Sequence, residues 1–182
     1  GERMTGAIQV LPLLAGEVED DEAARVAFML GSEVKGRKPL FIVSTDFTHY
    51  GPDYGYMPFR SSGTSTSDKI RGLDDRAVSY ILKKDCAGFS DYTERTGITI
   101  CGRNPVKIAL SLPVNDFRAS RVSYDMSGNV TGDYTNSVSY ASILFCGTLA
   151  AVNGPQTGSE DLTPGDKRFL LNLRQKFSFR YE

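Results

Sequence analysis

Asp46 and His49 are the first residues whose types and spacing could do chemistry. They lie three positions apart in the segment Ser44–Gly51, directly after the apolar run Leu40–Val43. A carboxylate at this spacing can orient an imidazole, or both groups can face a substrate as acid and base. The alternative is structural: Asp46 would cap a turn and His49 would be an ordinary polar residue. The position after a predicted buried strand favours the functional interpretation.

Cys101 and Arg103 form a second candidate, in the segment 101–105 (CGRNP). Asn104 is a good helix N-cap and Pro105 a good first helical residue, so Cys101 is predicted just before a helix N-terminus. The helix dipole and Arg103 both favour a thiolate, which could ligate a metal or attack an electrophile. Arg103 could also bind an anionic substrate. The alternative is that Cys101 packs as a small buried apolar side chain, as most free cysteines do.

Composition narrows the classes of function. The 182 residues are 40% hydrophobic and 24% charged, with net charge −1 and a pI of about 5.9, as in an ordinary globular protein. Because there is no clustered basic excess, a nucleic-acid partner is not expected. No apolar run approaches the roughly 18 residues that a membrane span needs, and no secretory signal opens the chain. We therefore expect a cytoplasmic protein without a membrane partner.

The cysteine and histidine counts limit what kind of metal site this chain can build. Cys86, Cys101 and Cys146 are odd in number and widely spaced, which favours reduced thiols over a disulfide framework. His49 is the only histidine in the sequence. A site that needs two or three imidazoles therefore cannot be assembled from one copy of this chain.

A strand, a helix and a second strand are predicted to position Asp46 and His49. The apolar run Ala7–Leu14 predicts a buried strand, Glu17–Leu30 has the acidic start and apolar face of a helix, and Leu40–Val43 predicts another buried strand. This is the βαβ pattern, in which ligands bind beyond the carboxyl ends of the strands. The polar residues after Val43 are expected at such an end.

The middle of the chain predicts a loop, then helices, then antiparallel strands. Residues 51–67 lack periodicity and are rich in Gly, Ser, Pro and aromatic residues, so we expect a long loop that covers the site. The predicted fold class is α/β, a mixed β-sheet flanked by helices. The helices are Asp74–Lys84, Ala87–Glu94 and one from Pro105 to Pro113, and the strands are Ala119–Met126 and Ser137–Cys146.

The composition changes after Val152. Residues 153–162 are typical of a flexible linker, and Thr163 and Pro164 are a helix start signal. The amphipathic helix predicted over residues 163–182 has no further segment with which to build a core. We therefore predict one domain over residues 1–152, a linker over 153–162 and an isolated helix over 163–182.

Three segments resemble the Memo family. They are residues 40–51 (LFIVSTDFTHYG), 98–110 (ITICGRNPVKIAL) and 137–141 (SVSYA), and the similarity extends over Ala7–Leu149. The resemblance implies a class III extradiol dioxygenase-like fold, of which this chain would carry the C-terminal half. Residues 162–175 are similar to the opening helix of an AMMECR-type domain, which implies that such a domain begins there.

The resemblance also implies the make-up of a site. In the family, two histidines from the N-terminal half and the cysteine that matches Cys101 hold a metal, with the residues that match Asp46 and His49 nearby. Both of those histidines would lie outside this chain, in agreement with its single histidine. We therefore expect the N-terminal half of the domain as a partner, in the same protein or as a separate chain, and poor metal binding by this chain alone.

Two functions agree with these features. The first is a metal-dependent redox protein or dioxygenase-like enzyme, with non-haem iron favoured by mixed N, O and S ligation and copper as the alternative. Cys101 would ligate the metal, His49 would act as acid/base or substrate ligand, Asp46 would orient His49, and Arg103 would bind an anionic substrate. The second, also implied by the resemblance, is a non-catalytic adaptor that holds a peptide or another protein in the same pocket. The expected ligand of the pocket is a peptide or a small molecule.

Overall fold

The computed structural model describes residues 10–60 and 64–150. Contacts divide the chain into two units, one formed by residues 17–151 and the other by residues 1–16 with 152–182. Of the second unit only residues 10–16 are described, and they have no regular secondary structure. The predicted linker over 153–162 and the predicted helix over 163–182 lie outside the described residues.

The apolar segment Ala7–Leu14 is not a strand over its described part, which starts at Val10. Val10, Leu11 and Leu14 are all exposed. A strand needs a hydrogen-bonding neighbour, and no strand among the described residues pairs with this segment. The prediction is therefore wrong for these residues, because an apolar run cannot specify the partner that a strand requires.

The sheet of the described residues is antiparallel and has β3 at its centre. β3 (Ser137–Leu149) lies between β1 (His49–Tyr50) and β2 (Val114–Met126), and both pairings are antiparallel. The two late strands are confirmed and are longer than predicted. The sheet is not mixed over the described residues, because the early segments that were to supply parallel pairing are not strands.

The run Leu40–Val43 is not a strand either. Residues 40–48 have no regular secondary structure, and Leu40 and Ile42 are 83% and 82% exposed. The chain joins the sheet only at Phe47, whose N–H donates to the Ser139 carbonyl oxygen at 2.9 Å, while the Ser139 N–H donates to the Thr48 carbonyl oxygen at 3.0 Å. The predicted βαβ unit is therefore absent from the described residues, but the polar segment around Asp46 and His49 does meet the sheet.

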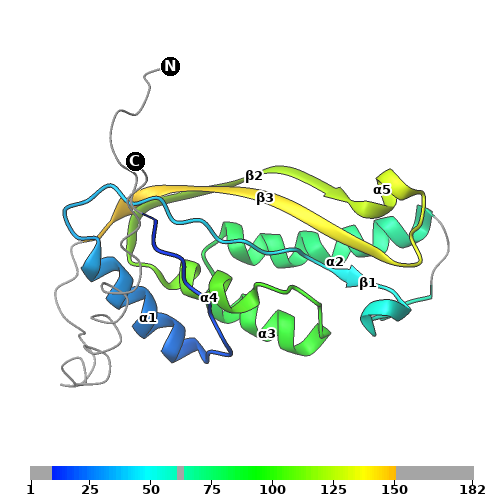
Figure 1. Cartoon of the computed structure of the whole chain (residues 1–182), viewed down its shortest axis with the longest axis horizontal. Coiled ribbons are helices and arrows are strands. Elements are labelled where there is room, and N and C mark those ends of the chain that lie inside the picture. The colour runs from blue at the N-terminus through cyan, green and yellow to red at the C-terminus, as the bar shows by residue number, and fades with distance from the viewer. Residues whose placement is uncertain (1–9, 61–63, 151–182) are drawn as a thin grey trace, which may run out of the picture. The chain divides into compact units, whose positions relative to one another are not determined.

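Helices cover one side of the long β2–β3 ribbon (Figure 1). The predicted helix over Glu17–Leu30 is confirmed as α1, and its capping box has the Glu19 N–H donating to the Glu22 carboxylate at 3.0 Å. The predicted helix over Ala87–Glu94 is confirmed as α3, where the Asp85 side chain accepts from the Gly88 N–H. The described helices are α1 (Asp20–Glu33), α2 (Thr64–Leu82), α3 (Cys86–Thr96), α4 (Arg103–Ser111) and α5 (Ser127–Thr131), with a 3-10 turn at Pro52–Tyr54.

The starts of two helices differ from the predicted ones, and one helix is additional. α2 begins at Thr64 and not at Asp74, so the loop after Gly51 is shorter than expected. α4 begins at Arg103 with Gly102 at the N-cap, so Asn104 lies inside the helix and does not cap it. α5 is the additional helix, and it lies between the two late strands. Local residue preferences identified α2 and α4 but did not fix where these helices begin.

The main core joins α2, α3 and α4 to the segments that carry the candidate residues. Phe47 is 1% exposed, and Ile98 and Ile100 are each 3% exposed. These three apolar side chains flank Asp46 and Cys101 in the sequence, and their burial anchors both segments. Within the described residues no helix is long and apolar enough to cross a membrane. The remaining buried members of this core are Ala77, Val78, Ile81, Phe89, Tyr92, Val106 and Leu110.

Candidate metal centre

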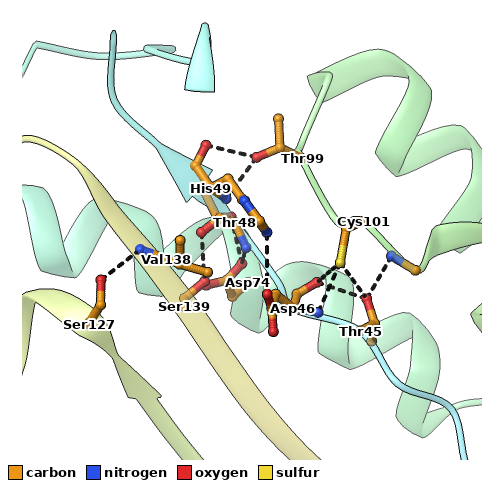
Figure 2. A network of polar contacts seen from close by, with 11 residues as sticks. Thr45, Asp46, Thr48, His49, Asp74, Thr99, Cys101, Ser127, Val138 and Ser139 are labelled. Atoms are coloured by element: carbon orange, nitrogen blue, oxygen red, sulfur yellow. Dashed lines mark hydrogen bonds and ion pairs between the residues drawn. The ribbon is translucent and has the colours of Figure 1, made fainter. Parts of the chain in front are cut away.

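The structure brings Asp46, His49 and Cys101 together. One ligand atom of each, a carboxylate oxygen, an imidazole nitrogen and the thiol sulfur, lies within 4.8 Å of the other two. Figure 2 shows Asp46 between His49 and Cys101, on the segment that leads into β1. Cys101 comes from the loop before α4, in which the buried side chains of Ile98 and Ile100 fix the backbone.

Thr45 holds the two segments against each other. Its hydroxyl donates to the Asp46 carbonyl oxygen and accepts from the Gly102 N–H, each at 2.8 Å. The Asp46 N–H donates to the Cys101 sulfur at 3.2 Å. Cys101 is exposed, so its sulfur combines a fixed position with access for a ligand. Thr45 was not recognised as a site residue in the sequence, since a threonine two residues after a predicted strand carries no distinctive signal.

His49 is held by its backbone and by an aromatic neighbour. Its N–H donates to the Thr99 hydroxyl at 2.8 Å, and the same hydroxyl donates to the His49 carbonyl oxygen at 2.9 Å. The edge-to-face contact with Tyr54 places the ring centroids 5.2 Å apart. The imidazole position therefore does not depend on Asp46 alone, as the sequence suggested.

The Nε2 atom of His49 is buried and has no hydrogen-bond partner among the described residues. It lies 3.7 Å from Oδ2 of Asp46, which is within ion-pair reach but too long for a hydrogen bond. Buried polar atoms nearly always have a partner, and the exceptions call for an explanation such as an absent ion. This atom therefore marks the cluster as a place where a further group could bind.

Gly102 permits the close approach of Cys101 to Thr45. A Cβ atom at this position would lie no farther than 3.0 Å from the Thr45 side chain and the Ser44 carbonyl oxygen. Glycine allows backbones to approach more closely than any other residue does. The glycine after Cys101 is thus a packing requirement of the site.

We expect Gly102→Ala to lower the free energy of unfolding by about 1–3 kcal/mol, the usual cost of overpacking, and to weaken metal binding because Cys101 is displaced. Urea denaturation measures the first effect and metal titration the second. Gly72→Ala is the matched control, since a Cβ there meets nothing within 4 Å. Equal stability changes in the two variants would contradict the role of Gly102.

Asp74 is a buried carboxyl group beneath the site. Its side chain accepts from the Thr48 N–H at 3.3 Å, the Thr48 hydroxyl at 2.7 Å and the Tyr124 hydroxyl at 2.6 Å, and the residue is fully buried. Burial raises the pKa of the Asp74 carboxyl above its ordinary value, and burial also raises the pKa of the Tyr124 hydroxyl. Because Thr48 lies between Asp46 and His49, this network fixes the backbone that carries both.

From the sequence, Asp74 was predicted only as the first residue of a helix. One signal could have revealed its role: Asp74 lies at helical spacing from Ile70, Ala77, Val78 and Ile81, all of which are buried. A carboxylate on an apolar helix face is seldom buried without partners.

Arg103 lines a hollow on the surface beside His49 and Cys101, and its side chain is paired with Glu17. Its Nη2 lies 2.9 Å from Oε2 of Glu17, and the hydrogen bond from Arg103 lowers the pKa of the Glu17 carboxyl. Both side chains are substantially exposed, so the pair is weak. The hollow has a volume of about 430 Å³ and is also lined by His49, Tyr54 and Cys101. Glu17 was not predicted, because nothing local connects it with Arg103.

The fold and the site define an α/β protein that gathers a carboxylate, an imidazole and a thiol at one end of an antiparallel sheet. Residues 2–144 match the Memo family, described as Memo-like protein, which is well over half of the chain. The chain belongs to this family. The dioxygenase-like fold and the assignment of this chain to the C-terminal half stay predictions.

Individual relatives agree with the family assignment. The chain is 31% identical over 146 residues to the protein memo-1 homolog of Caenorhabditis elegans, with 75% of this chain and 41% of the relative covered. It is 32% identical over 140 residues to a MEMO1 family protein of Pyrococcus abyssi, with 75% and 48% covered. A MEMO1 family protein of Schizosaccharomyces pombe is 29% identical over 157 residues. The chain thus spans about half the length of the curated relatives it matches.

Proposed function

We propose that this chain contributes Cys101, His49 and Asp46 to the metal site of a Memo-like redox protein. The observation that carries the proposal is the buried Nε2 of His49, which has no hydrogen-bond partner among the described residues and lies beside a thiol and a carboxylate. A metal ion would satisfy this atom and both neighbours at once. No described residue forms a hydrogen bond with Nε2 of His49.

The donor set fits a redox-active metal. An imidazole, a carboxylate and a thiolate together suit iron when positions are left open for substrate, and copper is the alternative. Bound there, such a metal would supply electron transfer and activation of an oxygen-containing substrate. Cys101 would hold the metal, and His49 would ligate it or exchange a proton with substrate. Asp46 would balance charge at the site, at 3.7 Å from the imidazole.

The remaining ligands would come from outside the described residues. Three donors leave a metal site incomplete, and the chain covers about half of its relatives' length. The exposed Leu40 and Ile42 lie on the segment that leads to the site, where a further part of the domain would bury them. We therefore propose that the rest of the family domain, in the same protein or as a separate chain, completes the site.

A peptide-binding adaptor is the second candidate function. Arg103 and Tyr54 line the hollow beside His49 and are 43% exposed, so an anionic peptide group could reach them. The metal proposal has the stronger support, because Arg103 already has a carboxylate partner in Glu17 whereas Nε2 of His49 has none.

Metal titration distinguishes the two functions. Under anaerobic conditions, iron(II), copper and zinc are titrated into this chain and into the complete family domain that contains it. We expect weak metal binding by the chain and tighter metal binding by the complete domain. The complete domain should show redox activity with iron or copper bound. Peptide affinity that persists after a chelator has removed all metal, with no metal-linked redox activity, would support the adaptor and reject the metal proposal.

A further inference from the structure

A second hollow lies on the surface formed by α2 and α3, and it shares no lining residue with the candidate metal centre. Its volume is about 540 Å³, within the range of roughly 300–1,000 Å³ for small-molecule sites. The lining residues that matter for its chemistry are Phe59, Lys69, Gly72, Arg76, Tyr92 and Arg95. Nothing in the order or spacing of these residues along the chain singles them out as a group.

Three cations and no acidic side chain line this hollow. Lys69 and Arg76 are two helical turns apart on one face of α2, and Arg95 comes from α3. Neither Lys69 nor Arg76 has an ion-pair partner in residues 10–60 and 64–150. Arg95 pairs with Asp91 at 3.5 Å, but both side chains are about two-thirds exposed, so a ligand could compete for Arg95. The hollow is therefore a local concentration of positive charge on a chain whose net charge is −1.

Apart from Thr96, the rest of the hollow is lined by apolar and aromatic residues, and two of the aromatic rings are fixed in place. The Tyr92 hydroxyl donates to the Leu73 carbonyl oxygen at 2.9 Å, which ties α3 to α2 and leaves the Tyr92 ring as the apolar part of the wall. Phe59 stacks on Tyr50 with ring centroids 4.9 Å apart, and Nζ of Lys69 lies 5.4 Å from the centroid of the Phe59 ring. Charge and apolar surface are thus side by side.

Gly72 leaves space between Lys69 and Arg76. It lies inside α2, where glycine is less favourable than alanine. A Cβ at Gly72 would meet nothing within 4 Å, so packing does not require glycine at this position. The missing side chain instead keeps the hollow open between the two cations.

We propose that this hollow binds a small phosphate ester. The guanidinium groups of Arg76 and Arg95 and the ammonium of Lys69 would hold the phosphate, because arginine pairs bidentately with phosphate oxygens. The apolar part of the ester would lie against Phe59 and Tyr92. Three cations favour a dianionic phosphate over a singly charged carboxylate.

Calorimetric titration of the full chain with phenyl phosphate, inorganic phosphate and benzoate at constant ionic strength tests this proposal. Phenyl phosphate should bind more tightly than inorganic phosphate, which lacks the apolar part, and more tightly than benzoate, which has a single charge. Arg76→Ala should weaken phenyl phosphate binding about tenfold, the usual effect of losing a charge-assisted hydrogen bond. Lys83→Ala is the matched control, because Lys83 is an exposed cation just beyond α2 that does not line the hollow.

Gly72→Leu tests the same proposal without changing any charge. Leucine is a better helix former than glycine, so the variant should keep its helical circular dichroism and its thermal midpoint while losing phenyl phosphate binding. Three results would overturn the proposal: unchanged binding in both Arg76→Ala and Gly72→Leu, equal weakening in Lys83→Ala and Arg76→Ala, or benzoate binding as tightly as phenyl phosphate.

Discussion

Replacing Cys101 by serine is expected to weaken metal binding by about a hundredfold or more. Loss of partners that only orient a ligand already costs roughly 10–100-fold, and Cys101 is proposed as a ligand itself. A serine hydroxyl is a hard, protonated donor and a poor substitute for a thiolate at an iron or copper site. Competition with a chelator of known affinity, carried out on the complete family domain, measures the effect.

Cys146→Ser is the matched control for this experiment. Cys146 is also an exposed free cysteine, but it lies on β3 and is not part of the cluster of Asp46, His49 and Cys101. Its replacement should leave metal affinity unchanged. If both cysteine variants bound metal as tightly as the unmodified protein, the sulfur would not be a ligand and the proposed site would be wrong.

Asp74→Ala is expected to have the largest effect on stability, about 3–5 kcal/mol in the free energy of unfolding. The substitution leaves the Thr48 N–H, the Thr48 hydroxyl and the Tyr124 hydroxyl without their acceptor. An unsatisfied buried group costs about 1–3 kcal/mol, and three groups in the lower part of this range give the stated loss. Urea denaturation measures the loss. Because Thr48 lies between Asp46 and His49, metal affinity should fall as well.

Asp75→Ala separates this effect from a general loss of an aspartate in α2. Asp75 pairs with Arg121, and both side chains are partly exposed, so this variant should lose about 1 kcal/mol or less. A similar loss of stability in the two variants would show that the Asp74 network is not a special support of the site.

The buried Asp74 carboxyl also makes a pH-dependent contribution. Its pKa is raised in the folded protein, chiefly by burial, above the ordinary value of 3.8. The folded state therefore keeps this proton at pH values where the unfolded chain has released it. Its contribution to stability is fully present below pH 3.8 and is lost as the pH rises through the raised pKa.

Asp74→Asn removes this titration while keeping the shape of the side chain. The stability of the unmodified chain relative to Asp74→Asn should fall as the pH rises from 3.8 through the folded-state pKa. Denaturation curves for both proteins over this pH range measure the difference. Parallel pH profiles would contradict a raised pKa at Asp74.

Local signals in the sequence identified α1, α3, α4, the second half of α2 and the late strands, but they did not identify α5. The acidic start of α1 and the alternation in β2 and β3 identify those elements, because each signal depends on neighbours in the chain. The runs Ala7–Leu14 and Leu40–Val43 failed as strands, since a strand depends on a partner that its own sequence does not specify. β2 and β3 pair antiparallel and are joined by a short connection. The expected parallel pairing would have joined segments that are farther apart in the sequence.

The site could be predicted only in part from the sequence, because several of its residues act through contacts between distant segments. Residue chemistry singled out Asp46, His49 and Cys101, but only the family resemblance connected segments 55 positions apart in the sequence. The residues that position them, Thr45, Thr99 and Asp74, were not found, because their roles arise from contacts across the fold. Glu17 was missed for the same reason, since its partner Arg103 is distant in the sequence.

X-ray absorption spectroscopy at the K-edge of the bound metal tests the central claim most directly. The complete family domain is loaded with iron, and the first coordination shell is compared with that of Cys101→Ser. The proposal predicts one sulfur ligand together with nitrogen and oxygen ligands in the unmodified protein, and loss of the sulfur in the variant. A first shell of nitrogen and oxygen alone in the unmodified protein, or a sulfur that persists in Cys101→Ser, would contradict it.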